Sequence, residues 1–447
     1  MNLRNLRATW QRFVRRFKRF TWGGVWAVTL PAERRQNLTL FFYDGMFAAA
    51  SDKIILTYIT IYLLSLGATR QQIGLLSSFS NLSAALLLLP AALLVERTGK
   101  RQQVTLRSAA GSRLAVFLMA LLPLVFNRTN GFIWVVLALA LLREIFNNTG
   151  FPGWMALTGD IVPPEGRGRY FGTRNLVMGI VGIITALVIG EAITRIGEPL
   201  GFQLSFILAA IFGVISMSFF ARLKDPLHSG DAEGKTIHQP GTGLLAILAS
   251  LKGQTSFLRF CAFTAVWNLA INIVAPFFSV YMVNTLNFTA AMIGVTTVAN
   301  SISNMIVQRR IGTIADRWGN RNVAVAALML IPALPLIWGL WVRQYWQVIL
   351  IQTIGGLIWG AYNLVSFNNL LLQTPENLRA RFSAFYQIIV TLSLAGGAAL
   401  GSYLIDRIDF EGVAIVSAGG RWVAALLFLV LVTDKPASKE STEKNHQ

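Results

Sequence analysis

The loop that follows one long apolar segment of this sequence is Gly-Thr-Ile-Ala-Asp-Arg-Trp-Gly-Asn-Arg, from Gly312 to Arg321. A related stretch, Ala-Leu-Leu-Val-Glu-Arg-Thr-Gly-Lys-Arg, occurs earlier in the chain, from Ala92 to Arg101. In both copies an acidic residue is followed directly by Arg, then by Gly two positions on and by Arg two positions after that. Because each copy ends one apolar segment and begins the next, the recurrence predicts a chain built from two related halves.

The composition is that of a membrane protein. Hydrophobic residues make up 54% of the 447 residues and charged residues 13%, whereas a soluble chain has about 25% charged residues. A bilayer accepts this apolar surface, which a water-soluble core could not bury. The net charge of +19 would indicate a nucleic-acid partner in a soluble protein. Here the basic residues fall between apolar segments, so we expect no nucleic acid as a partner.

Twelve apolar segments are long enough to cross a bilayer, which takes about 20 helical residues. We expect them at 38–66, 72–95, 103–126, 131–158, 170–194, 202–222, 257–284, 290–313, 322–342, 346–371, 382–404 and 411–433. Loops after the even-numbered segments are rich in Arg and Lys, and loops after the odd-numbered segments carry few charges. By the positive-inside rule, both termini are therefore expected to be cytoplasmic. The sequence predicts an all-α membrane protein with twelve transmembrane helices.

The remaining sequence forms two tails and a linker. Residues 1–37 are basic and aromatic and contain no secretory cleavage pattern. Apolar side chains at helical spacing in 1–20 predict an amphipathic helix on anionic lipids; the alternative is a disordered basic tail that only sets orientation. Residues 223–256 form a polar cytoplasmic linker between six-helix bundles at 38–222 and 257–433, and residues 434–447 form a cytoplasmic tail.

The paired loops resemble the signature of the major facilitator superfamily, a superfamily of secondary transporters. Other positions repeat as well, with Thr69, Ile73, Gly74 and Arg97 in register with Thr289, Ile293, Gly294 and Arg317. The resemblance covers about residues 38–433. It implies two six-helix bundles related by an internal repeat, with the site for a small-molecule substrate between them near the membrane midplane. It also implies a monomer in a bacterial inner membrane.

The resemblance further implies a cytoplasmic gate at the two loops. An acidic residue at the C-terminal end of a helix faces the negative end of the helix dipole, so it needs basic partners, which the neighbouring Arg and Lys residues of each loop supply. The first copy departs from the usual pattern by having Ala92 and Glu96 in place of Gly and Asp. The alternative is a solvated loop that only sets orientation. The gate candidates are Glu96, Arg97, Gly99, Arg101, Gly312, Asp316, Arg317, Gly319 and Arg321.

Charged residues inside the apolar segments are candidates for function, because each costs about 2.5–3.5 kcal/mol on insertion scales. The first segment contains Asp44, Asp52 and Lys53, and the fourth contains Arg143 and Glu144. With a helical rise of about 1.5 Å per residue, Asp52 and Arg143 lie at a similar depth near the midplane. The resemblance adds that the first and fourth segments line the cavity, and that Arg143 matches an arginine of the superfamily's fourth-segment motif.

We expect at least one of these charged residues to bind substrate or a proton. A carboxylate that releases its proton to one side of the membrane and regains it from the other is sufficient for coupling. The specific hypothesis is that Asp52 or Glu144 exchanges a proton during transport. The alternative is that the charges form ion pairs that only orient helices.

The second half offers neutral polar and aromatic side chains where the first half has charges. This division suggests proton coupling in the first half and contact with neutral parts of the substrate in the second. Alternatively, these side chains only hold helices together, as amides do in bilayers. The neutral candidates from both halves are Asn147, Trp154, Asn268, Asn272, Trp359 and Asn363.

Other chemistries find no support in the sequence. It contains no nucleotide-binding loop, metal-ligand cluster or nucleophile elbow, so we expect no enzyme activity, metal or cofactor. The expected function is proton-coupled secondary transport by alternating access, with export favoured over uptake. The glycine-proline antiporter signature of the fifth segment is absent in its usual form, which counts against a drug–proton antiporter. The alternatives are a proton-linked importer of a sugar or organic acid, and a transporter-like sensor or scaffold.

Overall fold

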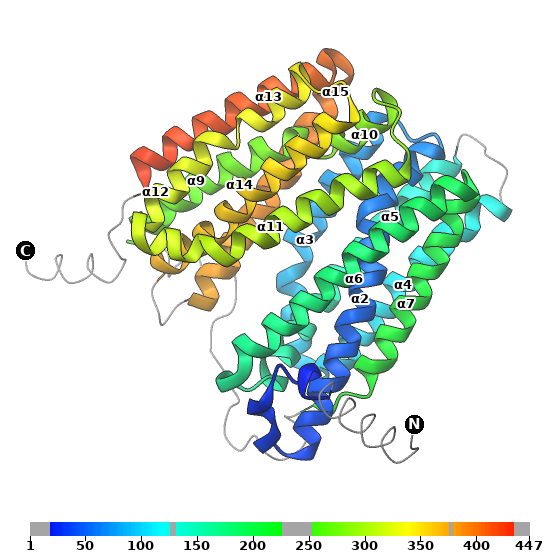
Figure 1. Cartoon of the computed structure of the whole chain (residues 1–447), viewed down its shortest axis with the longest axis vertical. Coiled ribbons are helices and arrows are strands. Elements are labelled where there is room, and N and C mark those ends of the chain that lie inside the picture. Colours follow the sequence, from blue (N-terminus) through cyan, green and yellow to red (C-terminus); the bar gives the residue numbers. More distant parts are fainter. Residues whose placement is uncertain (1–17, 126–130, 226–252, 375–378, 433–447) are drawn as a thin grey trace, which may run out of the picture. The chain divides into compact units, whose positions relative to one another are not determined.

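The structure is a computed structural model that describes residues 18–125, 131–225, 253–374 and 379–432. Every regular element in these ranges is a helix, so the expected all-α fold is confirmed (Figure 1). The predicted amphipathic helix at 1–20 lies largely outside the described residues, as do most of the linker and the C-terminal tail. The side chain of Asp316, one of the gate candidates, is also not described.

The elements of the first half follow one another with short connections. They are η1 (Val25–Thr29), α2 (Ala32–Ser65), α3 (Arg70–Thr98), α4 (Arg101–Val125), α5 (Phe132–Ile161), η2 (Pro164–Gly166), α6 (Arg167–Ile196) and α7 (Leu200–Ala221). The glycine at the turn between α3 and α4, Gly99, has a φ of 63°, a left-handed conformation that glycine adopts without strain.

The second half contains α9 (Thr255–Val274), α10 (Phe277–Asn284), α11 (Ala290–Trp318), α12 (Asn320–Leu330), α13 (Ala333–Leu340), α14 (Tyr345–Leu372) and α15 (Arg379–Leu431). Two spans are each broken into a pair of helices, α9 with α10 and α12 with α13. In both, a proline stands directly before the second helix, Pro276 and Pro332. Proline lacks the N–H that would continue the hydrogen-bond ladder, so the helix breaks there.

Eleven helical stretches of the described chain are long and apolar enough to cross a membrane. The last of them covers 50 residues and contains Asp409, whose φ of 52° is not helical. This residue divides α15 into segments at about 382–408 and 410–431. With that division, the stretches correspond to the twelve spans expected from the sequence.

The chain forms two compact units. Unit 1 comprises Met1–Ile59 with Leu87–Thr236, and unit 2 comprises Thr60–Leu86 with Ile237–Gln447. The end of α2 and the start of α3 thus belong to unit 2, where the Ser402 hydroxyl donates to the Gln71 carbonyl at 2.8 Å. The domain boundaries expected from the internal repeat remain a prediction.

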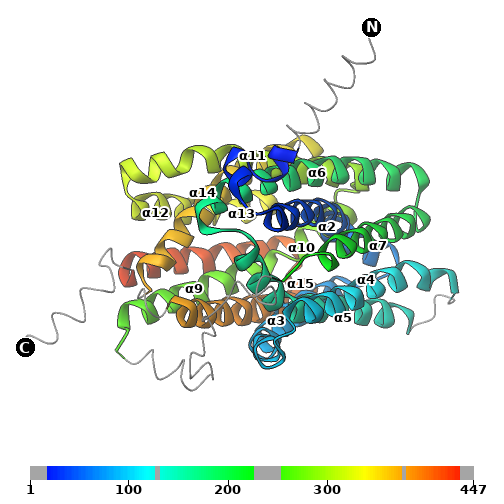
Figure 2. The ribbon, with the colours of Figure 1, turned by 90° about the horizontal axis from the view of Figure 1, so that it is seen from below.

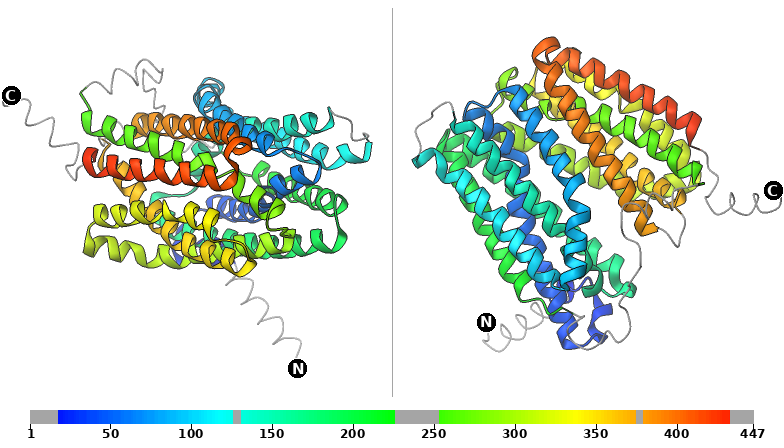
Figure 3. Two further views of the ribbon diagram at one scale, coloured as in Figure 1. Left: turned by 90° about the horizontal axis from the view of Figure 1, so that it is seen from above. Right: turned by 180° about the vertical axis from the view of Figure 1, so that it is seen from behind.

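Within each unit the helices run alongside one another (Figures 2 and 3). In unit 1, α4 packs against both α5 and α7, and α6 packs against α7. In unit 2, α9 packs against α15 and α11 packs against α14. These arrangements bring side chains from widely separated parts of the sequence into the interior of each unit.

The segment before α2 packs against residues of α2, α5 and α6 in unit 1. Ala27 in η1 is fully buried in an apolar cluster with Leu38, Ile161 and Tyr170. A methyl group placed on Gly166 would lie 2.2 Å from the ring of Trp26, so glycine is needed for this contact. Residues 18–30 therefore belong to the packed structure of unit 1.

Candidate functional site

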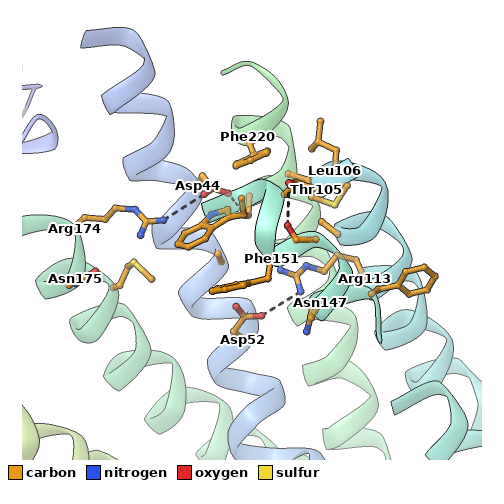
Figure 4. Close-up of a pocket in the computed structure, with 18 residues that line it drawn as sticks. Asp44, Asp52, Thr105, Leu106, Arg113, Asn147, Phe151, Arg174, Asn175 and Phe220 are labelled. Atoms are coloured by element: carbon orange, nitrogen blue, oxygen red, sulfur yellow. Dashed lines mark hydrogen bonds and ion pairs between the residues drawn. The ribbon is translucent and has the colours of Figure 1, made fainter. Parts of the chain in front are cut away.

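Unit 1 encloses a cavity of about 470 Å³. Its walls come from α2, α4, α5, α6 and α7 (Figure 4). The lining includes two carboxylates and two guanidinium groups, those of Asp44, Asp52, Arg113 and Arg174. The two carboxylates lie eight residues apart on α2, so about two helical turns separate them along one side of the cavity.

Asp44 is held in a buried network at one end of the cavity. Its carboxylate accepts a hydrogen bond from the Ser216 hydroxyl at 2.6 Å and pairs with the Arg174 guanidinium at 3.7 Å. Arg174 also donates to the Phe41 carbonyl at 3.1 Å and lies over the Phe41 ring at 4.1 Å. The side chains of Asp44 and Arg174 are 7% and 5% exposed, so this pair is shielded from solvent.

A glycine makes room for this arginine. A methyl group on Gly45 would lie 2.4 Å from the Arg174 guanidinium nitrogen. Because real side-chain carbons do not approach so closely, any other residue here would displace the arginine. The Asp44–Arg174 pair therefore depends on the residue that follows Asp44.

Asp52 is in a different environment. Its side chain is 43% exposed, and one of its oxygens is shared by Arg113 at 3.4 Å and Arg143 at 3.8 Å. Arg143 is buried and also contacts the carboxylate of its neighbour Glu144. Two arginines thus share two carboxylates, and Asp52 is the one that lines the cavity.

Arg113 is positioned by a close approach of α4 to α7. A methyl group on Gly213 would lie 2.3 Å from the Nε of Arg113. That nitrogen is buried and has no hydrogen-bond acceptor within the described part of the chain. Arg113 therefore has an unused donor beside the cavity carboxylate.

The neutral part of this cavity is mostly aromatic. Phe151 and Trp154 on α5 stack with ring centroids 6.1 Å apart, and Trp154 also contacts Phe41 at 6.2 Å. Asn147, one turn before Phe151, lines the same space (Figure 4). The cavity thus combines ring surfaces, one amide and opposite charges, which suits a ligand with both apolar and polar parts.

Unit 2 has a smaller cavity of about 270 Å³ between α9, α14 and α15. Of the residues predicted from the sequence, Asn268, Trp359 and Asn363 line it. None of the described residues that form its walls is charged.

The structure groups the predicted residues unevenly. Asp44, Asp52, Asn147 and Trp154 share the unit 1 cavity, and Arg143 and Glu144 lie behind Asp52. The sequence-based inference did not single out three residues that hold these carboxylates. They are Arg113, Arg174 and Ser216.

Lys53 and Asn272 line neither of these two cavities. The Asn272 amide donates to the Leu394 carbonyl at 2.7 Å, which ties α9 to α15. This contact fits the alternative anticipated for the amides, a link between helices.

The first loop of the paired pattern has different ion pairs from those expected. Glu96 and Arg97 are exposed. Arg101 is buried and pairs with Asp160 and Asp225, both at 2.5 Å. Arg101, one of the basic residues that the loop offered to Glu96, therefore joins the ends of α4, α5 and α7.

The second loop is held by backbone contacts. Gly319 has a φ of 84°, and Arg321 donates to the Leu429 carbonyl at 3.2 Å. Arg317 is exposed, and Gly312 has open space beside its α-carbon. The pairing of Asp316 with these arginines remains a prediction.

Comparison with known proteins identifies the family. A model of the Major Facilitator Superfamily matches the chain twice, over residues 45–271 and 255–447. The chain belongs to this superfamily. The resemblance inferred from the paired loops is thus confirmed, and so is the internal repeat.

Sequence relatives of this superfamily member extend over most of its length. Multidrug resistance protein MdtG of Salmonella heidelberg (strain SL476) is 24% identical over 407 residues, which cover 87% of this chain and 94% of that protein. The protein of the same name from Enterobacter lignolyticus (strain SCF1) is 25% identical over 405 residues, with 87% and 90% covered.

Solved structures show the same fold. The nucleoside transporter NupG aligns with a TM-score of 0.69 and 13% identity, covering 89% of this chain and 98% of that one. A bacterial homologue of the human lysosomal transporter Spinster aligns with a TM-score of 0.65 and 11% identity, covering 90% and 97%. The chain is an integral membrane protein and a secondary transporter of the major facilitator type.

Proposed function

We propose that this transporter exports a small molecule in exchange for protons, and that Asp52 is the group that takes up and releases the proton. The contrast between the two cavity carboxylates carries this proposal. Asp44 is buried and accepts a short hydrogen bond from Ser216, whereas Asp52 is 43% exposed and has two contacts at 3.4 and 3.8 Å. A carboxylate that can reach water and loosen its ion pairs is the better proton carrier.

Protonation of Asp52 would change the charge balance of the cavity. The ionised carboxylate of Asp52 can pair with a positively charged group of a substrate, whereas the neutral acid cannot. Because Glu144 also contacts Arg143, it can hold that arginine while Asp52 is protonated. Substrate and proton would thus compete for the Asp52 carboxylate, which is sufficient for exchange.

The direction of transport is inferred from the relatives. The two sequence relatives described above, which align with most of this chain, are named for multidrug resistance, and this favours export of amphipathic compounds. We further propose that the protein resides in the bacterial inner membrane as a monomer with both termini in the cytoplasm, and that its basic N-terminal helix lies on anionic lipids.

Transport into proteoliposomes tests the function. Norfloxacin is a suitable probe, because it is fluorescent, has a planar ring system and carries both a positively charged amine and a negatively charged carboxylate. With protein inserted in both orientations, an imposed proton gradient should drive its accumulation above equilibrium, and collapse of the gradient should release it. In Asp52→Asn, downhill exchange should persist while gradient-driven accumulation is lost.

The same assay separates the alternatives. Accumulation on the side where protons are scarce would indicate proton-linked uptake instead of exchange. An absence of flux for norfloxacin and for a broad panel of sugars, organic acids and drugs would favour the sensor or scaffold. Gradient-driven accumulation that is unchanged in Asp52→Asn would contradict the assigned role of Asp52.

A further inference from the structure

The unit 2 cavity differs from an ordinary packing gap because it combines aromatic rings with two amides that have no hydrogen-bond partner among the described residues. It lies inside unit 2, between α9, α14 and α15, and has a volume of about 270 Å³. Pockets for drug-sized ligands have volumes of about 300–1,000 Å³. The space is therefore suited to one ring system of a larger substrate.

Three rings form the wall on α9 and α14. Trp267 lies 5.3 Å from Tyr362 and 6.3 Å from Trp359, and the Trp359 and Tyr362 rings meet at 86°. Trp267 and Tyr362 are buried, while Trp359 is partly exposed. The planes of these rings are inclined at 47° and 86° to one another, so the wall offers both ring faces and ring edges to an aromatic group.

The helix α15 contributes a further ring to the lining, that of Tyr386. Tyr386 stacks on Phe260 with ring centroids 5.7 Å apart and an interplanar angle of 10°. This stacking covers one face of the tyrosine, while the residue still lines the cavity. A flat ring fits such a space better than a bulky aliphatic group.

Two amides give the cavity its polar character. Asn363 on α14 and Gln387 on α15 are exposed, line the cavity and have no hydrogen-bond partner among the residues that the structure describes. Each carboxamide offers two N–H donors and one carbonyl acceptor. A ligand that displaced their water would have to replace both kinds of hydrogen bond.

We infer that this cavity is a subsite for an uncharged, flat aromatic group that carries both a hydrogen-bond donor and an acceptor, as a ring carboxamide does. The inference rests on the transport function proposed above and names the chemical class of the substrate's neutral part. Trp359 and Tyr386 contact the ring, and Asn363 and Gln387 bind its polar edge.

A quaternary ammonium group is the competing occupant, because tryptophan and tyrosine also attract cations. Two features argue against it. Among the described residues no carboxylate lines the cavity, so a cation would lose its hydration without a counter-charge from them. Such a group also has neither a donor nor an acceptor for the two free amides.

Calorimetric binding to the full-length protein in nanodiscs tests the inference with three probes. These are 2-naphthamide, its saturated analogue decahydro-2-naphthamide, and the cation 1-methylquinolinium. We expect 2-naphthamide to bind at least about 10-fold more tightly than the other two, since the saturated analogue lacks the aromatic ring and the cation lacks the hydrogen-bonding edge. Asn363→Ala should weaken its binding about 3- to 10-fold, and Trp359→Leu by a similar factor.

Matched variants outside the cavity serve as controls. Asn284→Ala and Trp341→Leu change an exposed asparagine and an exposed tryptophan of unit 2, and should leave binding unchanged. Thermal unfolding without ligand shows whether each variant remains folded. Tighter binding of 1-methylquinolinium, equal losses in control and cavity variants, or no binding of 2-naphthamide would each overturn the inference.

Failure of this inference can be told apart from failure of the proposed function. Norfloxacin flux with no binding of 2-naphthamide would contradict the subsite and leave transport intact. Binding of 2-naphthamide without flux of any compound would support the subsite and contradict the proposed export.

Discussion

The two cavities of this transporter are built from different chemistry. The unit 1 cavity is lined by two carboxylates and two guanidinium groups, and the unit 2 cavity by rings and amides without a charge. Burying a charge is costly unless it is paired or hydrogen-bonded. Unit 1 meets this condition with glycines beside its arginines, so we assign the proton to unit 1 and the neutral part of the substrate to unit 2.

The largest effect is expected from breaking the buried pair of unit 1. Arg174→Gln leaves Asp44 buried without its cation, which should lower the free energy of unfolding by about 3–5 kcal/mol. Arg195→Gln is the matched control on the same helix, because Arg195 pairs with Glu191 while 78% exposed, and it should cost about 0.3–0.5 kcal/mol. Equal midpoints of thermal unfolding for both variants would show that burial does not distinguish these pairs.

The next effect concerns the glycines. Gly213→Ala places a methyl group against Arg113 and should cost about 1–3 kcal/mol by overpacking. In unit 2, Gly355 has no neighbour closer than 3.7 Å, so Gly355→Ala should be neutral or stabilise its helix by up to about 1 kcal/mol. Denaturation in detergent checks both variants. A Gly213→Ala protein with unchanged stability and unchanged transport would contradict the claim that the close approach of α4 to α7 positions Arg113.

A smaller effect is expected in the unit 2 cavity. Asn363→Ala should raise the KM for norfloxacin by an amount equivalent to about 0.5–1.5 kcal/mol, since one hydrogen bond is lost. The number of protons moved per substrate should not change, because the residue carries no charge. A changed proton ratio, measured in proteoliposomes, would show that the two cavities are not chemically separate.

The smallest effect is expected for the exposed ion pair of unit 2. Arg343 and Glu411 lie 2.8 Å apart with side chains 51% and 55% exposed. Glu411→Gln should change the free energy of unfolding by no more than about 1 kcal/mol, since solvent screens such pairs. Thermal unfolding at low and high salt checks this, and a loss as large as that of Arg174→Gln would contradict the contrast between the units.

The fold could be predicted almost fully from the sequence. The apolar segments of spanning length and the loop pattern that occurs twice are local features of the sequence. The first predicts the spans that the structure contains, and the second predicts the internal repeat. The boundary within α15 is an example, since the charged residues Asp406, Arg407, Asp409 and Glu411 interrupt the apolar sequence where the helix is interrupted. Breaks at Pro276 and Pro332 are also visible in the sequence as prolines within spans.

The site could be predicted only in part. Asp44 and Asp52 stand out as charges in an apolar span, and the same rule could have found Arg113 and Arg174. The rule cannot give the pairing, because Arg174 reaches Asp44 only after α2 and α6 pack together. Arg101 shows this most clearly, since its partners Asp160 and Asp225 are far from it in the sequence.

Arg421 and Glu411, ten residues apart on α15, show the same limit. Arg421 is buried and donates to the Ile271 carbonyl at 3.3 Å, and Glu411 pairs with Arg343. Distance along one helix could not show which residue of a neighbouring helix would be closer.

Substrate-driven proton movement in proteoliposomes tests the central claim most directly. The protein is reconstituted with a pH-sensitive dye inside the vesicles, and norfloxacin is added outside. We predict that proton movement is lost in Asp52→Asn, reduced in Glu144→Gln and retained at saturating norfloxacin in Asn363→Ala. Proton movement that is unchanged in both Asp52→Asn and Glu144→Gln, or lost only in Asn363→Ala, would contradict the assignment of coupling to unit 1.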